Sequence, residues 1–379
     1  MIGGRGSLDG GRTIAARLVR TGLSETEAAS LWSVPVAQPE PHVPFRFIDL
    51  FAGIGGIRLG LERAGGRCVY TVEFDRFAMQ TYSANFGELL ADGSRRPEPP
   101  RDIYDVRVTD LPPYDVLAAG FPCQPFSLAG VSKKLSLGRQ HGFEDKKSGN
   151  LFFEIMRLVD EAGTPPPMLF LENVKHLTRH DKGKTFRVIR DTIEDRGYNL
   201  AWKVIDAQPW VPQHRERTFM IALHRDVYGD RYFEFPEQRP EGPRPVLDRL
   251  LETGPVDPKY TLSEHLWGYL QDYAAKHRAA GNGFGYGLVG PADVARTLSA
   301  RYHKDGSEIL VATGDPTPRR LTPRECARLM GYPDDFVVPV SDTQAYRQFG
   351  NSVAVPVIEW LGRAIVEQGL VAPLPNPGD

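Results

Sequence analysis

A cysteine enclosed by two prolines is the first candidate for chemistry. Cys123 lies in the stretch GFPCQPFS, residues 120–127, directly after the apolar run YDVLAAG. Phe121 and Gln124 each precede a proline, which disfavours helical backbone angles and predicts a stiff, extended segment. A cysteine that only packs in a core is expected inside the apolar run. We therefore interpret Cys123 as a nucleophilic thiol that a nearby positive charge would activate, with a buried structural cysteine as the alternative.

A carboxylate and a row of basic side chains could act with this thiol. Glu172 closes the apolar run PMLFL, so loss of solvent should raise its pKa and suit it to act as an acid. Gln213, Arg215 and Arg217 alternate in QHRERTFMIAL, and strand alternation predicts that they share one face. They would direct donors at a substrate ring or phosphate, or at Cys123 or Glu172. The alternatives are a surface carboxylate and a solvated basic edge.

A glycine-rich turn indicates a cofactor. Gly53 and Gly55 belong to DLFAGIGG, residues 49–56, but the spacing is not the GxGxxG of a dinucleotide-binding fold. Glu73 ends the next apolar run about 20 residues later, where an acidic side chain can accept hydrogen bonds from ribose hydroxyls. The pair favours an adenosine-containing cofactor without a pyrophosphate, such as S-adenosylmethionine. The alternative is a simple tight turn.

These residues require a fold that brings them together. From Phe45 on, short apolar runs alternate with amphipathic stretches, which predicts an α/β fold with a largely parallel sheet covered on both faces. Ligands of such sheets bind beyond the carboxyl ends of the strands, where all these candidates lie. Residues 225–342 lose the alternation, and NSVAVPVIEWLGRAIVEQG predicts a helix that returns to the first domain. We predict an N-terminal extension at 1–44 with a short helix at LSETEAASLW, a catalytic and cofactor-binding domain at 45–224 plus 343–379, and a smaller irregular domain at 225–342.

The composition is that of an ordinary globular protein, with 41% hydrophobic and 25% charged residues. The formal net charge of -2 does not indicate nucleic acid, but basic residues follow both Cys123 and Glu172. The first segment includes Lys133, Lys134 and Arg139, and two such segments beside one site favour phosphate contacts. The three cysteines are widely spaced and no apolar run could span a bilayer. We therefore expect no metal site, no membrane association and a reducing, cytoplasmic compartment.

Six motifs in order carry a family resemblance. They are FIDLFAGIGG, GFPCQPFSLAG, LFLENVKHL, PQHRERTF, RRLTPRECARLMGYPD and QFGNSVAVPV. The set resembles the DNA cytosine-5 methyltransferases from Phe45 to Val357, most closely the Dcm-type enzymes. The resemblance implies a Rossmann-like domain that uses S-adenosylmethionine and releases S-adenosylhomocysteine, and a target-recognition domain that binds double-stranded DNA. It also implies a prokaryotic protein, associated with the nucleoid when bound to DNA, and a role in DNA methylation or restriction–modification.

The same resemblance implies roles for individual residues. Cys123 would attack C6 of a flipped cytosine, Glu172 would protonate or hold N3, and Arg217, with Arg215, would orient the base and Glu172. Cofactor contacts are implied for Phe51, Gly53, Gly55, Glu73, Phe74, Asp102, Ile103 and Asn351. DNA contacts are implied for Gln124, Ser127, Lys133, Lys134, Arg139, Thr297 and Arg301.

The similarity to Dcm-type enzymes suggests methylation of the inner cytosine of a CCWGG-like site, with CCNGG or CCGG as alternatives. An RNA cytosine-5 methyltransferase and an inactive DNA-binding scaffold are the other hypotheses. The size of region 225–320 favours DNA over RNA, and the intact set of Cys123, Glu172 and Arg217 favours an enzyme. With one active site in the chain, a monomer would suffice.

Overall fold

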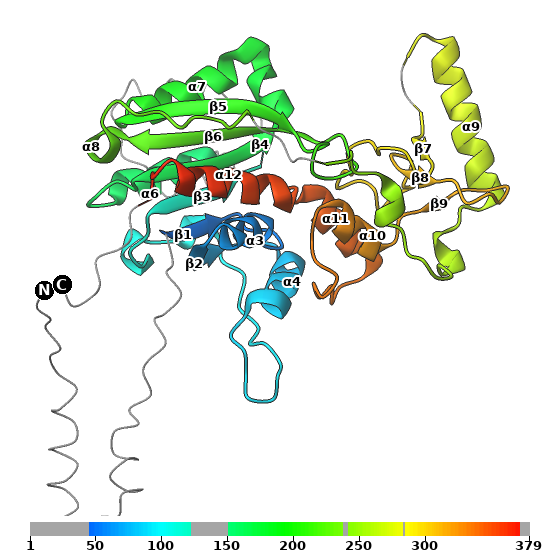
Figure 1. Cartoon of the computed structure of the whole chain (residues 1–379), viewed down its shortest axis with the longest axis horizontal. Helices are drawn as coiled ribbons and strands as arrows, with labels where there is room; N and C mark the ends of the chain where they lie inside the picture. Colours follow the sequence, from blue (N-terminus) through cyan, green and yellow to red (C-terminus); the bar gives the residue numbers. More distant parts are fainter. Residues whose placement is uncertain (1–44, 123–150, 238–241, 283–284, 372–379) are drawn as a thin grey trace, which may run out of the picture. The chain divides into compact units, whose positions relative to one another are not determined.

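Strands and helices alternate along the first half of the chain, as the apolar runs predict. The computed structural model describes residues 45–122, 151–237, 242–282 and 285–371, so the predicted extension at 1–44 lies outside it (Figure 1). The alternating elements are β1 (Phe45–Leu50), α3 (Gly56–Arg63), β2 (Gly66–Val72), α4 (Arg76–Phe86), β3 (Val116–Gly120), α6 (Leu151–Glu161), β4 (Met168–Val174), α7 (Lys184–Glu194), β5 (Tyr198–Asp206) and β6 (Glu216–His224). Short 3-10 turns lie at Ile103–Asp105, Val108–Asp110, Lys175–Thr178 and His180–Gly183.

These six strands form one sheet in the order β2-β1-β3-β4-β6-β5. β1 pairs in parallel with β2 and β3, and β3 pairs in parallel with β4. β6 runs antiparallel to both of its neighbours. The predicted, largely parallel sheet is therefore confirmed. Because β6 is antiparallel to β4, the start of β6 lies at the edge of the sheet where β4 ends, with Arg217 opposite Val174.

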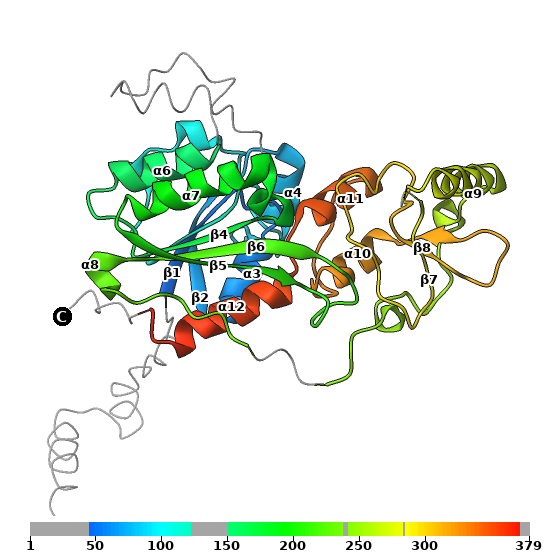
Figure 2. The same cartoon turned by 90° about the horizontal axis from the view of Figure 1, so that it is seen from above.

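Helices cover both faces of the sheet, because alternate strand residues point to opposite sides. Val116 and Ala118 pack with α3 and with the C-terminal helix α12 (Val355–Glu367). Leu117 and Ala119 pack with α6 and α7 on the other face. Figure 2 shows this arrangement, with α6 and α7 on one side of the strands and α3 and α12 on the other. The predicted return of the C-terminal helix to the first domain is thus confirmed.

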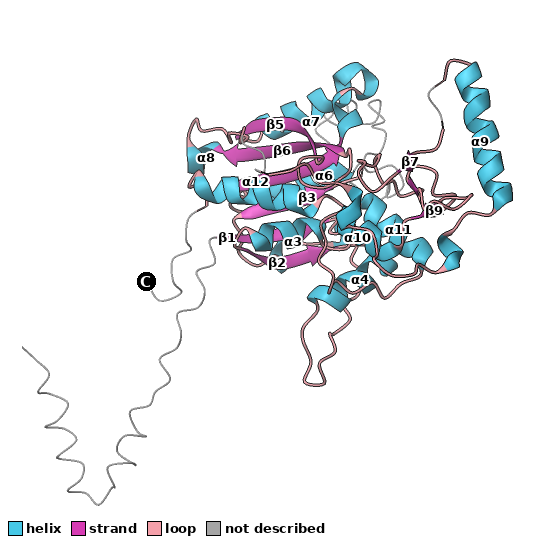
Figure 3. Ribbon diagram, turned by 45° about the vertical axis from the view of Figure 1, so that its right-hand side comes forward, coloured by secondary structure: helices cyan, strands magenta, loops and turns pink. Residues whose placement is uncertain are grey.

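Region 225–342 is irregular, as predicted (Figure 3). Its elements are α8 (Arg225–Tyr228), 3-10 turns at Leu247–Arg249 and Pro258–Tyr260, α9 (Glu264–Ala279), β7 (Leu288–Val289), β8 (Leu310–Val311), β9 (Arg319–Arg320) and α10 (Pro323–Leu329). The three strands form a small second sheet in the order β7-β8-β9. It is followed by α11 (Asp342–Asn351), which leads to α12.

A third hydrophobic cluster joins this region to the main sheet. Leu298, Tyr302 and Leu321 are buried in it together with residues of α10 and α11. Ile54, from the turn after β1, and Ala78, from α4, belong to the same cluster. The described residues from Phe45 onward accordingly fall within one compact unit. This shared core fixes the irregular region against the turns that follow the strands.

Candidate active site

A cavity of about 500 Å³ opens at the edge of the sheet where β1 to β4 end. Its lining includes the predicted residues Phe51, Gly53, Glu73, Phe74, Glu172, Arg217 and Asn351. Phe121 and Pro122, which immediately precede Cys123, line the same cavity. The prediction that these groups meet at one edge of the sheet is therefore confirmed for the described residues.

The turn after β1 has an unusual backbone. Phe51, Gly53 and Gly55 have φ angles of 59°, 56° and 82°. Left-handed angles suit glycine but are uncommon for phenylalanine, and such strain is concentrated at functional sites. The turn is held against β2, because Ala52 N donates to Val72 O at 3.1 Å. Gly55 itself lies against the ring of Phe86 rather than in the cavity lining.

Glu73 joins this turn to the start of α4. One carboxylate oxygen accepts a hydrogen bond from Gly53 N at 2.7 Å, and the other accepts one from Asp75 N at 2.6 Å. Asp75 in turn caps α4 by accepting from Phe77 N and Ala78 N. Burial raises the pKa of Glu73 above its ordinary value, against the effect of these hydrogen bonds. The neighbouring Phe74 is 71% exposed and presents an uncovered ring to the cavity.

Glu172 and Arg217 form a pair on the cavity wall. The Glu172 side chain is held by Arg217, with 3.1 Å between Nε and Oε1. The antiparallel pairing of β4 with β6 brings these two residues together. Glu172 is only 8% exposed, and burial raises its pKa despite the opposing charges of Arg217 and Arg215. The predicted desolvation of this carboxylate is confirmed, so it can hold a proton nearer neutral pH than an exposed glutamate.

The segment that leads to Cys123 is fixed beside Glu172. Gly120 pairs with Glu172 in the sheet, and a β-carbon at Gly120 would lie 3.4 Å from Glu172 Oε2. Asn173 Nδ2 donates to Phe121 O at 2.8 Å, which ties the next residue to β4. Cys123 itself, with Gln124, Ser127, Lys133, Lys134 and Arg139, lies outside the described residues. The described chain thus reaches the cavity one residue before the predicted nucleophile.

Gln213 and Arg215 are buried on either side of the exposed His214, as strand alternation predicts, and Ala207 N donates to Arg215 O at 3.0 Å next to β6. The expectation that they direct donors at the site with Arg217 is wrong, because neither side chain lines the cavity. The buried side chain of Gln213 accepts from Leu298 N at 2.7 Å. Arg215 donates to backbone carbonyls, and within the described residues no hydrogen bond joins it to Glu172.

Asp102 and Ile103 lie beside the cavity but do not line it. Arg101 N donates to Glu73 O at 2.8 Å, which brings this segment next to the end of β2. Asp102 caps a 3-10 turn by accepting from Tyr104 N at 3.1 Å. Ile103 is buried in the core under the α6 face of the sheet. The structure therefore places both close to the predicted cofactor residues.

The sequence reasoning missed one face of α11. Gln344, Arg347 and Gln348 line the cavity together with the predicted Asn351. The four positions are spaced i, i+3, i+4 and i+7, which places them on one face of a helix. Gln348 also links α11 to α4, since it accepts from Thr81 Oγ1 at 2.9 Å. The helical spacing of polar residues before Asn351 is the signal that could have identified them.

Asp49 is a buried carboxylate in β1, two residues before Phe51. It is fully buried, and neither carboxylate oxygen has a hydrogen-bond partner within the described residues. Burial is the largest cause that raises its pKa to about 8, while the nearby Arg58 opposes the shift. The folded protein therefore holds a proton at neutral pH that the unfolded chain releases.

We expect the pH dependence of stability to change in Asp49→Asn. Because the folded-state pKa is raised, the free energy of unfolding should fall by about 1.4 kcal/mol per pH unit between about pH 5 and pH 8 from this group alone. The uncharged asparagine should remove that contribution and flatten the slope. Urea unfolding at several pH values would measure it. Parallel pH profiles for the two proteins would contradict the raised pKa.

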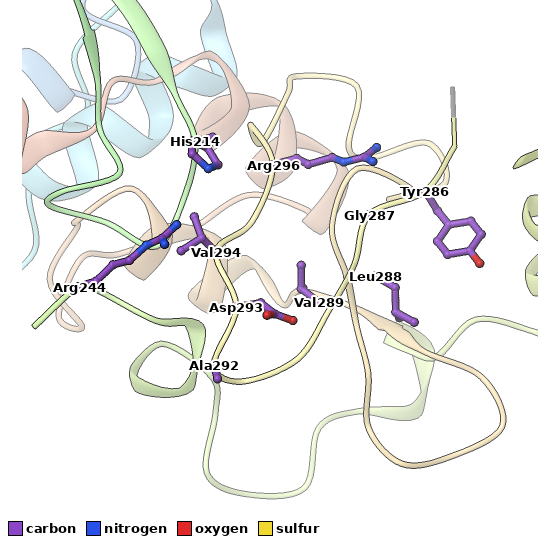
Figure 4. Close-up of a pocket in the computed structure, with 10 residues that line it drawn as sticks. All are labelled: His214, Arg244, Tyr286, Gly287, Leu288, Val289, Ala292, Asp293, Val294 and Arg296. Carbon is purple, nitrogen blue, oxygen red and sulfur yellow. The ribbon is translucent and has the colours of Figure 1, made fainter. Parts of the chain in front are cut away.

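A second cavity of about 500 Å³ lies in the irregular region (Figure 4). Its lining includes the basic side chains of His214, Arg244 and Arg296 and the ring of Tyr286. Figure 4 shows Arg296 extending toward Tyr286, whereas His214 and Arg244 lie near Val294. Arg296 donates to Gly285 O at 3.3 Å. The same lining holds the carboxylate of Asp293, so the two arginines leave it with a net positive charge that suits an anionic ligand.

The predicted recognition residues Thr297 and Arg301 lie next to this cavity in the chain but do not line it. Thr297 Oγ1 donates to His214 O at 2.5 Å, which connects the segment to the residues before β6. Arg301 is exposed, and its backbone N–H donates to Ser299 Oγ at 3.1 Å. Arg301 is thus a surface residue, three positions after the buried Leu298.

Within the described ranges, no group of three or more His, Cys, Asp or Glu side chains is arranged to hold a metal ion. Among the helices described, none combines the length and apolar character that a membrane span requires.

Solved structures share this fold. The methyltransferase Dnmt2 of S. pombe aligns with a TM-score of 0.66 over 86% of this chain and 99% of its own, at 20% sequence identity. At that identity the likeness concerns the fold, which is that of a methyltransferase with a mixed α/β sheet.

Sequence comparisons identify the family. The model of the C-5 cytosine-specific DNA methylases matches residues 45–367. The DNA-cytosine methyltransferase of Escherichia coli (strain K12) is 48% identical, over 88% of this chain and 80% of its own. The type II methyltransferase M.NlaX of Neisseria lactamica is also 48% identical, over 86% of this chain and 96% of its own. The chain therefore belongs to the C-5 cytosine-specific DNA methylase family.

Proposed function

We propose that this chain transfers a methyl group from S-adenosylmethionine to C5 of a cytosine that is flipped out of duplex DNA. The observation that carries the proposal is the buried pair of Glu172 and Arg217, which shares one cavity with Pro122 and with the turn at Gly53. An acid with a raised pKa thus lines the same cavity as Pro122, and Cys123 is the next residue in the sequence. Because one chain supplies all these groups, we propose that a monomer is sufficient.

The residues of the cavity fit S-adenosylmethionine. Each oxygen of Glu73 accepts one backbone hydrogen bond, which leaves lone pairs for two ribose hydroxyls. The exposed ring of Phe74 offers a stacking surface for adenine, and Phe51, Gly53 and Asn351 would complete the lining around the rest of the molecule. Asp102 and Ile103 would approach it from the segment that is bonded to Glu73. When bound, S-adenosylmethionine supplies an electrophilic methyl group on a sulfonium centre.

The proposed reaction at the cytosine begins and ends at Cys123. The thiolate of Cys123 would bond to C6, and the electron pair of the C5–C6 double bond would form a C4–C5 double bond. The pair of the former C4–N3 double bond would take the proton that Glu172 donates to N3. C5 is then nucleophilic and would take the methyl group by displacing S-adenosylhomocysteine, which keeps the electron pair of the broken S–CH3 bond. Loss of the C5 proton to a base re-forms the double bond and expels the thiolate, while the N3 proton returns to Glu172. Arg217 keeps Glu172 in place throughout, and Arg215 supports it through its charge.

Region 225–342 would be the target-recognition domain, and 45–224 with 343–379 the catalytic domain. Thr297, Arg301 and the basic cavity of His214, Arg244 and Arg296 would contact DNA. Gln124, Ser127, Lys133, Lys134 and Arg139 would contact the flipped base and its flanking phosphates from the segment after Cys123. We propose a CCWGG-like site, methylated at the inner cytosine, on the basis of the Dcm-type motifs. CCNGG and CCGG are the alternatives.

Bisulfite sequencing of plasmid DNA from a methylation-deficient host that expresses this chain tests the proposal. We expect protected cytosines at one CC…GG sequence, and the central bases would distinguish CCWGG from CCNGG and CCGG. A soluble protein that binds S-adenosylmethionine but protects no cytosine would overturn the proposed reaction.

Glu73→Ala should weaken the binding of S-adenosylhomocysteine on the order of 100-fold. Two ribose hydroxyls would lose a charged acceptor, and the turn at Gly53 would lose its hydrogen bond to the carboxylate. Isothermal titration calorimetry measures the affinity directly. Glu88→Ala, which removes an exposed glutamate, is the control and should bind normally. Equal affinities for the two variants would refute the contact.

A further inference from the structure

Arg215 connects two segments that are far apart in the sequence. One terminal nitrogen donates to Leu298 O at 2.8 Å. The other donates to Gly350 O at 3.0 Å and also to Ser352 O. The side chain is 1% exposed, and within the described residues no ion pair joins it to a carboxylate. Within the described residues Nε has no hydrogen-bond partner, so the two terminal nitrogens and these carbonyls carry the compensation that a buried guanidinium requires.

Direct packing strengthens the same connection. A β-carbon at Gly350 would lie 2.3 Å from the carbonyl carbon and oxygen of Ser299, so the two backbones are in contact at this point. Gln213, two residues before Arg215, accepts a hydrogen bond from Leu298 N at 2.7 Å. The segment 297–300 is therefore held between the residues before β6 and the end of α11. A displacement of 297–300 cannot occur without moving one of these two neighbours.

The two connected segments belong to different parts of the proposed reaction. Segment 297–301 carries Thr297 and Arg301, the proposed DNA contacts. Gly350, Asn351, Ser352 and Val353 line the cavity proposed for the cofactor. Ser352 is also held by its hydroxyl, 2.7 Å from the Tyr332 hydroxyl, and by its backbone N–H, which donates to Gln348 O at 3.0 Å, so Arg215 is one of several contacts that fix its position. Because Arg215 binds both segments, a displacement of the backbone at Leu298 should also displace the backbone at Gly350, which lines the cavity.

We propose that Arg215 is a positioning residue that couples DNA binding to cofactor binding. It would do so by keeping the carbonyl of Leu298 and the carbonyls of Gly350 and Ser352 at a fixed separation. The proposal rests on the proposed function, since both ligands are defined there. Coupling of this kind is reciprocal: DNA strengthens cofactor binding by the same factor by which the cofactor strengthens DNA binding.

The test is the affinity for S-adenosylhomocysteine with and without saturating duplex DNA, measured by calorimetry on the full chain. The duplex contains the sequence found methylated in the plasmid assay. For the unchanged protein we expect DNA to tighten binding at least about fivefold. In Arg215→Met and Arg215→Lys, the affinity measured with DNA divided by the affinity measured without DNA should fall to about one. The lysine keeps the charge, but its single nitrogen cannot replace two nitrogens that serve different segments.

Arg225→Met is the matched control. Arg225 also binds a backbone carbonyl, Tyr198 O at 3.0 Å, but it does so at the opposite end of β5 and β6. In Arg225→Met, the ratio of the affinities for S-adenosylhomocysteine with and without DNA should equal that of the unchanged protein. If Arg215→Met does not fold, as judged by thermal unfolding, Arg215→Lys decides the outcome.

An unaltered ratio in a folded Arg215 variant, or a ratio of one in the unchanged protein, would overturn the coupling. Either result would leave the proposed methylation intact as long as plasmid cytosines are protected. Absence of methylation in the unchanged protein would contradict the proposed function instead.

Discussion

Cys123→Ser should reduce methyl transfer to duplex DNA by at least about 1,000-fold. A serine hydroxyl is far less acidic than a thiol, so it forms almost no anion near neutral pH and cannot add to C6 at a useful rate. The substitution replaces one sulfur with oxygen, and none of the noncovalent contacts proposed for the cofactor or for DNA uses that atom. Binding of S-adenosylhomocysteine and DNA should therefore persist. Transfer of a labelled methyl group from S-adenosylmethionine measures the loss, and calorimetry measures the retained binding.

Cys68→Ser is a matched control for this experiment. Cys68 lies in β2, half-buried, with its sulfur 3.5 Å from Tyr70 O. Burial raises the pKa of the Cys68 thiol to about 11, so it stays protonated and unreactive near neutral pH. The control should retain most of the activity. A Cys123→Ser protein that methylates DNA as fast as the Cys68→Ser protein would eliminate the covalent mechanism.

Glu172→Gln should lower the rate of methyl transfer by about 100-fold to 10,000-fold, the range typical of a lost general acid. Glutamine has the same size and can still accept from Arg217, but it has no proton to donate to N3. Single-turnover kinetics with saturating DNA and cofactor would isolate this step. Because burial raises the pKa of Glu172, the wild-type rate should fall as the pH increases through that pKa, when the acid loses its proton. The variant should lack this decline.

Glu216→Gln provides the comparison for Glu172→Gln. Glu216 begins β6, one residue before Arg217, but its half-exposed side chain pairs with Lys175 at 2.5 Å instead of lining the cavity. Removing that surface pair should leave the rate of methyl transfer within about threefold of the wild-type rate, because exposed ion pairs contribute little to the free energy of folding. If Glu172→Gln were no slower than Glu216→Gln, the acid would have to be another group.

Local sequence was sufficient to predict the strands of the main sheet and much of the candidate site. The apolar runs predicted the strands, and the rule that ligands bind beyond strand ends predicted that Gly53, Glu73 and Glu172 would meet. That prediction succeeded because a parallel sheet brings the carboxyl ends of its strands to one edge, whatever the order of the strands. The desolvation of Glu172 followed from the apolar residues before it.

Tertiary structure alone decided which basic side chain reaches Glu172. Alternation predicted a shared role for Arg215 and Arg217, but only the antiparallel pairing of β6 with β4 brings Arg217 to the carboxylate. Arg215 instead binds carbonyls 83 and 135 residues further along the chain. Every residue carries such a carbonyl, so no residue type marks these partners in the sequence. Residue types and their spacing thus predicted the strands, the turns and the carboxylate at their edge, whereas long-range backbone packing determined how segment 297–301 is connected to the cavity that Glu172 lines.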